Sequence, residues 1–495
     1  MESIIKTISN PVFFTVNNSY PIQSDISLEC DEVDIIGVTA TVLNQSVECM
    51  SGITKGLVRV AFTVLYANEK PAVYESGADL SFEQRDDKIE QNSLYQLKCE
   101  CEDVKFLVKE DGTITVSAIV EVHATYCAKS ELSFLQDIEG AVVKTEQRKV
   151  YNSRGCMQAT SANFEGEKKF NFEIEKVLCH NDSARLLQTE CGIGEIIVDG
   201  EILSEFTLLT SSGEIVTSFM TTAFRYEIES EGVSVDSVAF ASARLQNANF
   251  KISFLNEENA SKIDAEYTLN FGAVVLDECA VNCVIDGFST THEITVNSEN
   301  LNFNSGFSFT SYKHKCFGEG ICEIEQGEKV VCSLNSRVEI LQFNTQPTDG
   351  VYKVEGIVYC NLLTVNNQKY KIKQAKIAFD FNIESELEML DLNATASNVI
   401  VRGLEQKCII DCEIVFGVLS KKCESCNCVC FVEEGEKRAT TQSAISVLFI
   451  SKGDDLWTVC KKALTTEQSI LADNPDITFP VASDKAIVVY KSLND

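Results

Sequence analysis

Four cysteines in the segment 423–430 form the cluster that comes closest to a chemical site: Cys423, Cys426, Cys428 and Cys430. A Cys-x-x-Cys pair with further thiolates nearby could hold zinc tetrahedrally. Zinc domains usually place two such pairs around a knuckle and a loop, however, and few of those spacing cues are present. Cys426, Cys428 and Cys430 alternate with the period of a β-strand, which predicts that they share one face. Three interpretations stay open: a packed strand edge, which we favour, disulfides between assembled copies, and a zinc site.

The four histidines lack the sequence neighbours of a catalytic group. They are His123, His180, His292 and His314, and none lies in a Ser/His/Asp-like or His-x-x-x-His context. The chain has no Gly-x-x-x-x-Gly-Lys-Ser/Thr loop, so we expect no Walker-type nucleotide site. Acidic pairs are common among 74 Asp and Glu residues, and we interpret them as solvated surface. The sequence therefore predicts a protein that is not an enzyme and needs no cofactor.

Charge and composition narrow the classes of partner. The net charge of −32 argues against nucleic-acid binding, because phosphate contacts need clustered Lys and Arg, and it disfavours anionic lipid. The N-terminus has no apolar core of signal-peptide length, and no run has the length of a membrane span. We therefore expect a cytoplasmic protein without a membrane span. In a reducing compartment, the 21 cysteines would serve mostly as small apolar residues.

Strand patterns dominate the chain before residue 430, and they recur about every 150 residues. Each copy has a central hairpin followed by a strand that ends in an aromatic-rich patch. The hairpin tips lie near residues 68, 211 and 366. The patches contain Phe82, Phe224 and Phe379. A second hairpin follows in each copy; the first of these turns at Asp111-Gly112, a strong hairpin signal.

These repeats predict a mainly β protein with three tandem β-sandwich-like domains. The expected domains are 1–145, 146–298 and 299–432. We interpret the polar segments Lys144–Lys169 and Thr291–Ser305 as linkers between them. The segment 433–443, rich in Glu, Lys, Thr and Ser, is expected to be a solvated tether before a last domain at 444–495.

The central strands resemble those of the SPOCS domain, a β-rich module of spore-coat assembly proteins. Val198-Asp199-Gly200-Glu201-Ile202 and Val354-Glu355-Gly356-Ile357-Val358 are similar to that module's Val-x-Gly-x-hydrophobic strand. The first copy fits less well, because Gly56 is expected to precede its strand. SPOCS domains followed by a C-terminal LysM domain are typical of coat-morphogenesis proteins of anaerobic spore formers, and this domain order is the stronger argument for the resemblance.

The last fifty residues predict a small strand–helix–helix–strand module. An apolar run at 446–450 precedes Gly453-Asp454-Asp455-Leu456-Trp457, two short helical patterns follow, and 486–490 is a final strand. We expect Asp454 or Asp455 to cap the first helix, Thr465 with Gln468 to form a capping box on the second, and Trp457 to be half-buried.

This module resembles a LysM domain, a family that binds N-acetyl sugars or, in some members, other proteins. The resemblance implies a shallow groove between the first strand–helix loop and the second helix–strand loop. Its residues would be Gly453, Asp454, Asp455, Leu456, Asn474, Pro475, Asp476 and Ile477. The usual threonine after Gly-Asp is replaced by Asp455, so we favour a protein partner over a glycan. The alternative is that these residues only build the fold.

Together the resemblances imply a scaffold of the bacterial spore coat. Such a protein would lie in the mother-cell cytoplasm at the forespore surface, with its LysM-like module docked on a coat morphogenetic ATPase. Its β-domains would recruit other coat proteins or self-associate through edge strands. The alternative function is binding of peptidoglycan or cortex glycan through the LysM-like module.

Overall fold

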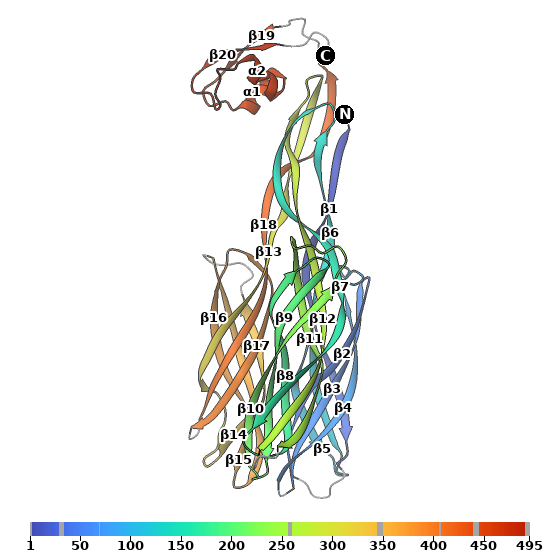
Figure 1. The fold of residues 1–495 in the computed structure, drawn as a ribbon, viewed down its shortest axis with the longest axis vertical. Helices are drawn as coiled ribbons and strands as arrows, with labels where there is room; N and C mark the ends of the chain where they lie inside the picture. Colours follow the sequence, from blue (N-terminus) through green and yellow to red (C-terminus); the bar gives the residue numbers. More distant parts are fainter. Residues whose placement is uncertain are drawn as a thin grey trace.

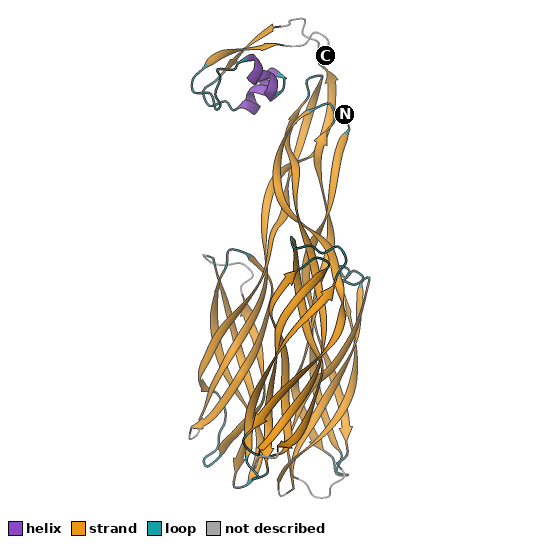
Figure 2. Ribbon diagram, in the orientation of Figure 1, coloured by secondary structure: helices purple, strands orange, loops and turns teal. Residues whose placement is uncertain are grey.

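The structure, a computed structural model, is mainly β, as predicted from the sequence (Figure 2). It describes residues 2–28, 34–68, 70–255, 260–343, 350–404, 407–438 and 445–490. Within these ranges it has twenty strands and two short helices. Residues 439–443 of the expected tether lie outside the described ranges.

The first six strands form two antiparallel three-stranded sheets. Their bounds are β1 (Ser3–Ile26), β2 (Asp34–Met50), β3 (Ile53–Asn68), β4 (Lys70–Arg85), β5 (Leu94–Val108) and β6 (Ile114–Ile138). One sheet has the order β1-β6-β5 and the other the order β2-β3-β4. The strand pair β3–β4 is the first predicted central hairpin, and β5–β6 is the hairpin predicted at Asp111-Gly112.

The next twelve strands repeat this order twice. Their bounds are β7 (Val142–Phe170), β8 (Ile174–Cys191), β9 (Glu195–Thr210), β10 (Ile215–Glu229), β11 (Ser237–Leu255), β12 (Ala260–Phe288), β13 (His292–Gly320), β14 (Lys329–Phe343), β15 (Val351–Asn366), β16 (Lys369–Glu384), β17 (Glu388–Leu404) and β18 (Lys407–Lys437). Their sheets are β7-β12-β11 with β8-β9-β10, and β13-β18-β17 with β14-β15-β16. We call β1–β6, β7–β12 and β13–β18 units 1, 2 and 3.

Each unit packs its two sheets around its own apolar core. The central strands show the alternation that such packing requires. In β6, Ile114, Val116, Ala118, Val120 and Val122 are all at most 3% exposed, and the residues between them are partly exposed. The period of two in the sequence therefore follows directly from a strand with one face on the core.

Six long strands continue beyond the sandwiches and form a narrow stalk (Figure 1). They pair as three ribbons, β1–β6, β7–β12 and β13–β18. The ribbons share one core, to which every unit contributes. Its buried side chains are Ile8, Phe134, Val150, Val281, Cys283, Phe303, Cys426 and Cys428. A second shared core lies where the ribbons join the body and contains Phe13, Tyr95, Tyr151, Phe240, Phe307 and Leu419.

The stalk corrects two of the linker predictions. The segment 144–169 belongs to β7, and 291–305 belongs almost entirely to β13. Both segments are polar because only one face of each ribbon is buried, so their sequences look like linkers. Residues 433–437 of the expected tether likewise continue strand β18.

Three glycines occupy equivalent places in the units, each opposite a phenylalanine of the next strand. The cross-strand pairs are Gly56–Phe82, Gly200–Phe224 and Gly356–Phe379. A Cβ atom on these glycines would lie 2.2, 2.3 and 2.5 Å from the phenyl ring, so the ring occupies the space of a side chain. The prediction that Gly56 precedes its strand is wrong, because β3 begins at Ile53. Polar residues at its start, among them the buried Thr54, hide that strand in the sequence.

The C-terminal residues form the predicted order of strand, two helices and strand. The elements are β19 (Ile445–Ile450), α1 (Leu456–Ala463), α2 (Glu467–Asp473) and β20 (Lys485–Tyr490). Strands β19 and β20 pair antiparallel, and the helices cover one face of this small sheet. We call residues 445–490 the C-terminal module.

Candidate functional site

The C-terminal module packs against the tip of the β7–β12 ribbon at the top of the stalk (Figure 1). Phe288 at the end of β12 is 3% exposed, and its ring centroid lies 5.4 Å from that of Trp457 in α1. Val142 at the start of β7 packs against the same cluster. Trp457 is therefore only 8% exposed, and the prediction that it is half-buried is wrong. The sequence could not show that a distant strand end covers it.

Asp286 on β12 is the polar centre of this contact. Its carboxylate accepts a hydrogen bond of 2.8 Å from the Trp457 indole Nε1 and bonds of 2.8 Å to both oxygens from the Lys461 ammonium. The Gly287 backbone N–H donates to it as well. Partial burial raises the pKa of Asp286, but Lys461, Trp457 and Gly287 outweigh that effect, and its pKa is lowered. The carboxylate is thus held ionised between the stalk and the module.

The first loop of the expected groove is held by hydrogen bonds of the Gly453 backbone and of the Asp454 and Asp455 carboxylates. Gly453 has φ +91, a conformation that favours glycine, and its N–H donates to the carbonyl of Val481. The Asp454 carboxylate accepts from the Ser451 N–H and pairs with Lys462 at 2.7 Å. Asp455 is the N-cap of α1, as one of the two predicted alternatives, and its side chain accepts from the Thr458 N–H at 2.8 Å. Asp455 also lies 3.9 Å from Lys144 of the stalk.

In the second loop of the expected groove, some residues stabilise the fold and others are exposed. The Asn474 side chain bonds to the backbone of Ile470 and to both the N–H and the carbonyl of Val488. In this loop Ile477 is buried, and Pro475 and Asp476 are exposed, while Leu456 of the first loop is partly buried. The N-cap of α2 is Thr466, which accepts from the Ser469 N–H at 3.3 Å, so the predicted Thr465–Gln468 capping box is wrong. The observed cap lies one residue later than predicted, after the left-handed Leu464 that ends α1.

The outer face of the β19–β20 sheet is apolar and exposed. Ile445, Val447 and Phe449 alternate along β19 and are 56%, 61% and 79% exposed, and Tyr490 of β20, paired with Ile445, is 55% exposed. The helices cover only the opposite face. We did not select these residues from the sequence, although the signal was there: β19 is apolar at nearly every position, while a two-stranded sheet backed by helices needs only one apolar face.

The cysteine cluster does not converge on one point. Cys426 and Cys428 lie inside the stalk core, while Cys423 and Cys430 are exposed. The prediction that Cys426, Cys428 and Cys430 share one face is wrong, because the pairing skips Cys430: Val429 is opposite Ser298 and Phe431 is opposite Asn297. Such a bulge reverses the alternation. No group of three or more potential metal ligands occurs among the described residues.

The buried thiols of the stalk are in a low-reactivity environment. Burial is the main reason that the pKa of Cys283 is raised to about 11, and burial also raises the pKa of Cys428. The Cys423 Sγ instead donates to Asn304 Oδ1 at 3.2 Å at the stalk surface. All cysteines within the described ranges are free thiols.

The histidines remain separate from one another. His180 donates from Nδ1 to the Asp182 carboxylate at 2.6 Å, two residues along β8, and its ring centroid lies 4.8 Å from that of Phe250. Burial lowers the pKa of His180, but the bond to Asp182 outweighs it and the pKa is raised. Burial lowers the pKa of His123. His292 begins β13, and His314 lies in the C-terminal half of the same strand.

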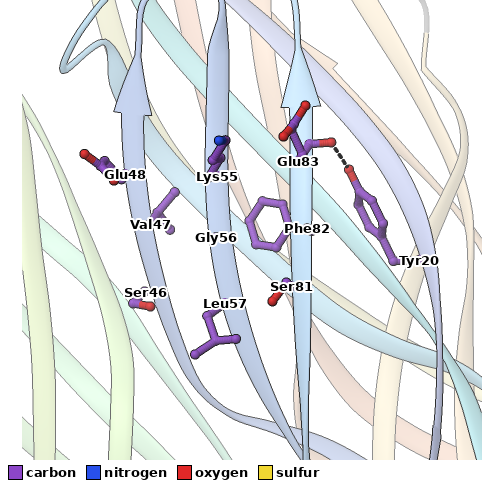
Figure 3. Close-up of a pocket in the computed structure, with 10 residues that line it drawn as sticks. All are labelled: Tyr20, Ser46, Val47, Glu48, Lys55, Gly56, Leu57, Ser81, Phe82 and Glu83. Atoms are coloured by element: carbon purple, nitrogen blue, oxygen red, sulfur yellow. Dashed lines mark hydrogen bonds between the residues drawn. The ribbon is translucent and has the colours of Figure 1, made fainter.

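A shallow hollow of about 650 Å³ lies on unit 1 around Gly56 and Phe82 (Figure 3). Tyr20 borders it and donates from its hydroxyl to the Glu83 carbonyl at 2.6 Å. In units 2 and 3 a bulge in β8 and in β14 brings a backbone carbonyl, of Arg185 or Glu339, close over the matching glycine. Strand β2 has its bulges elsewhere, so the hollow is a feature of unit 1.

Comparison with protein-family models, with curated proteins and with solved structures found no match. Among the described residues, no helix has the length and apolar character needed to cross a bilayer.

Proposed function

We propose that this chain is a non-enzymatic scaffold of the bacterial spore coat, and that its C-terminal module docks on a coat morphogenetic ATPase. The observation that carries the proposal is the exposed apolar sheet face of the module, at the far end of a long stalk. Such a position suits a module that must reach a partner while the body remains free for other contacts. The site of action would be the mother-cell cytoplasm at the forespore surface.

The chemistry of the module favours a protein partner over a glycan. Ile445, Val447 and Phe449 offer a flat apolar surface with an aromatic residue, the composition found at the centre of protein interfaces. Two polar side chains expected to bind a sugar already form bonds within the module, because Asn474 is hydrogen-bonded to Val488 and Asp454 is paired with Lys462. Glycan binding therefore stands as the alternative outcome of the test below.

The three units support the assignment to SPOCS-like repeats. Each has a glycine covered by a phenylalanine from the next strand at the same place in the same sheet order. Strands β4 and β10 are sheet edges and could pair with other coat proteins or with further copies of the chain.

The test is capture of the ATPase from a lysate of sporulating cells. Full-length protein is compared with the variants Phe449→Asp and Phe254→Asp, each with and without soluble peptidoglycan fragments. Phe254 is 65% exposed in the body and serves as the matched control. We expect full-length protein and Phe254→Asp to capture the ATPase, Phe449→Asp to lose it, and glycan to have no effect. Equal capture by all three proteins would contradict the proposed surface, and displacement by glycan would establish the alternative function.

A further inference from the structure

We propose that the stalk tip is a docking site for the C-terminal module, and that Asp286 fixes the orientation in which the module presents its sheet face. The docking contact is a property of the chain alone. Its effect on partner binding rests on the function proposed above.

The polar part of the contact is specific to the module. Asp286 receives the only indole N–H of the chain, from Trp457, and the ammonium of Lys461, four residues further along α1. Residues four apart lie on the same helix face, so the Asp286 carboxylate contacts two side chains of one face of α1. Both carboxylate oxygens have charge-assisted bonds, which are shorter and stronger than neutral ones.

The apolar part adds a second fixed point. Phe288, two residues from Asp286 on β12, places its ring against Trp457 at an interplanar angle of 58°. Val142 lies opposite Phe288 in the β7–β12 ribbon and packs against the same cluster. A carboxylate and a phenyl ring on one strand thus both contact one indole, which leaves the module little freedom to rotate.

The docked orientation separates two surfaces of the module. Helix α1 and Asp455 lie toward the stalk, with Asp455 3.9 Å from Lys144. The β19–β20 strands run along the top of the module, and Phe449 on them is 79% exposed (Figure 1). An undocked module would have no fixed orientation relative to the stalk. Docking removes this freedom before a partner arrives, and such preorganisation raises affinity by lowering the ordering cost of binding.

Trp457 is the only tryptophan, so its fluorescence reports docking directly. The test compares the full chain with Asp286→Asn and with the control Asp264→Asn. Asp264 lies on the same strand and pairs with Lys262 at 2.6 Å, far from the tip. We expect Asp286→Asn to shift the emission to longer wavelength and to raise quenching by acrylamide about twofold, as a buried indole becomes exposed. The variant Asp286→Lys with Lys461→Asp should recover much of the original emission.

A second measurement gives the affinity of the full chain and of each variant for the ATPase. We expect Asp286→Asn to weaken this affinity about fivefold, because the variant loses the fixed orientation of the module but keeps its binding face. Asp264→Asn should leave the affinity unchanged. Unchanged emission and quenching in Asp286→Asn would overturn the docking site. A changed emission with unchanged affinity would overturn its role in presentation. Loss of docking with no ATPase captured by any protein would instead count against the proposed function and leave the docking site standing.

Discussion

The body and the stalk are built from the same long strands, but they bury side chains in different ways. In the body, each long strand belongs to a three-stranded sheet that packs on a second sheet of its own unit. In the stalk, each strand has one partner, and its buried face meets the ribbons of the other two units. The same strand therefore passes from a local core to a shared one.

This difference predicts different stabilities. A two-stranded ribbon is at best marginally stable alone in water, so the stalk holds together only while all three ribbons contribute. Each unit of the body has a complete core with side chains such as Phe62, Phe206 and Phe416 at 0% exposure. We therefore expect the stalk to open locally before the body unfolds.

The largest expected destabilisation is that of unit 2 by a substitution at its Gly200–Phe224 pair. In Gly200→Ala the new Cβ would lie 2.3 Å from the Phe224 ring and 2.4 Å from the Arg185 carbonyl oxygen, so the backbone itself must move. We expect a loss of about 3 kcal/mol in the free energy of unfolding, measured by denaturant titration. Gly306→Ala is the control, because its nearest neighbour would be Lys422 Cβ at an ordinary 3.4 Å.

The same substitution in unit 1 sharpens the comparison. In Gly56→Ala the three atoms nearest the new Cβ would all belong to the Phe82 ring and none to the backbone, because β2 has no bulge at this place. Its cost should be smaller than that of Gly200→Ala. Equal losses at the two sites would show that the bulge of β8 does not distinguish the units.

The next effect tests whether the stalk opens separately from the body. Cys423 and Cys430 are exposed, whereas Cys283 has a pKa raised to about 11 by burial in the shared core. Relative to the ordinary cysteine pKa of 9.0, this increase alone lowers the thiolate fraction at neutral pH about a hundredfold, so iodoacetamide should label Cys283 at least that much more slowly. Peptide mass spectrometry of timed samples measures each rate. Labelling of Cys283 as fast as of Cys430 would mean that the stalk core is open in solution.

The body was easier to predict from the sequence than the stalk, for a physical reason. The hairpins β3–β4, β9–β10 and β15–β16 combine apolar alternation with turn residues, and both signals are local. The stalk strands β7 and β13 bury one narrow face on other units, and their polar exposed faces resemble linkers. Cys430 shows the same limit on a smaller scale, because a bulge set by pairing reversed the face that alternation had predicted.

The candidate site was predictable only in its elements. The order of strand, helices and strand, and the cap at Asp455, follow from local patterns. The partners of Trp457 do not, because Asp286 and Phe288 lie about 170 residues earlier in a segment with no signal of its own. The exposure of Ile445, Val447 and Phe449 on β19 could not be predicted either, because the sequence does not show which face of the strand the helices cover.

A pH-dependent effect concerns the junction between units 2 and 3. Glu205 on β9 is 8% exposed, its Oε1 has no hydrogen-bond partner, and burial raises its pKa to about 8. A raised carboxyl pKa means that the folded protein binds the proton more tightly, so stability falls as pH rises from about 4.5 to 8. Glu205→Gln should remove this dependence and stabilise the chain by up to about 4 kcal/mol at pH 7.5.

Denaturant titrations at pH 5 and pH 7.5 would check this prediction. Glu229→Gln, at an exposed position on β10, is the control and should change neither value. If wild type and Glu205→Gln had the same stability difference between the two pH values, Glu205 would not titrate at this junction.

The smallest effect returns to the stalk tip and separates docking from folding. Lys461 and Trp457 lower the pKa of Asp286, so docking is favoured above the ordinary Asp range and weakens as pH falls through the lowered pKa. The side chains of Asp286 and Lys461 are 31% and 46% exposed, and solvent screening limits the contribution to about 0.5–1 kcal/mol. Trp457 emission should hence stay constant from neutral pH to about 4 and shift below it, while far-ultraviolet circular dichroism keeps its β signal. In Asp286→Asn the emission should not depend on pH over this range. An acid shift of equal size in that variant would assign the change to unfolding of the module, where Asp454 and the N-cap Asp455 also carry carboxylates with lowered pKa values.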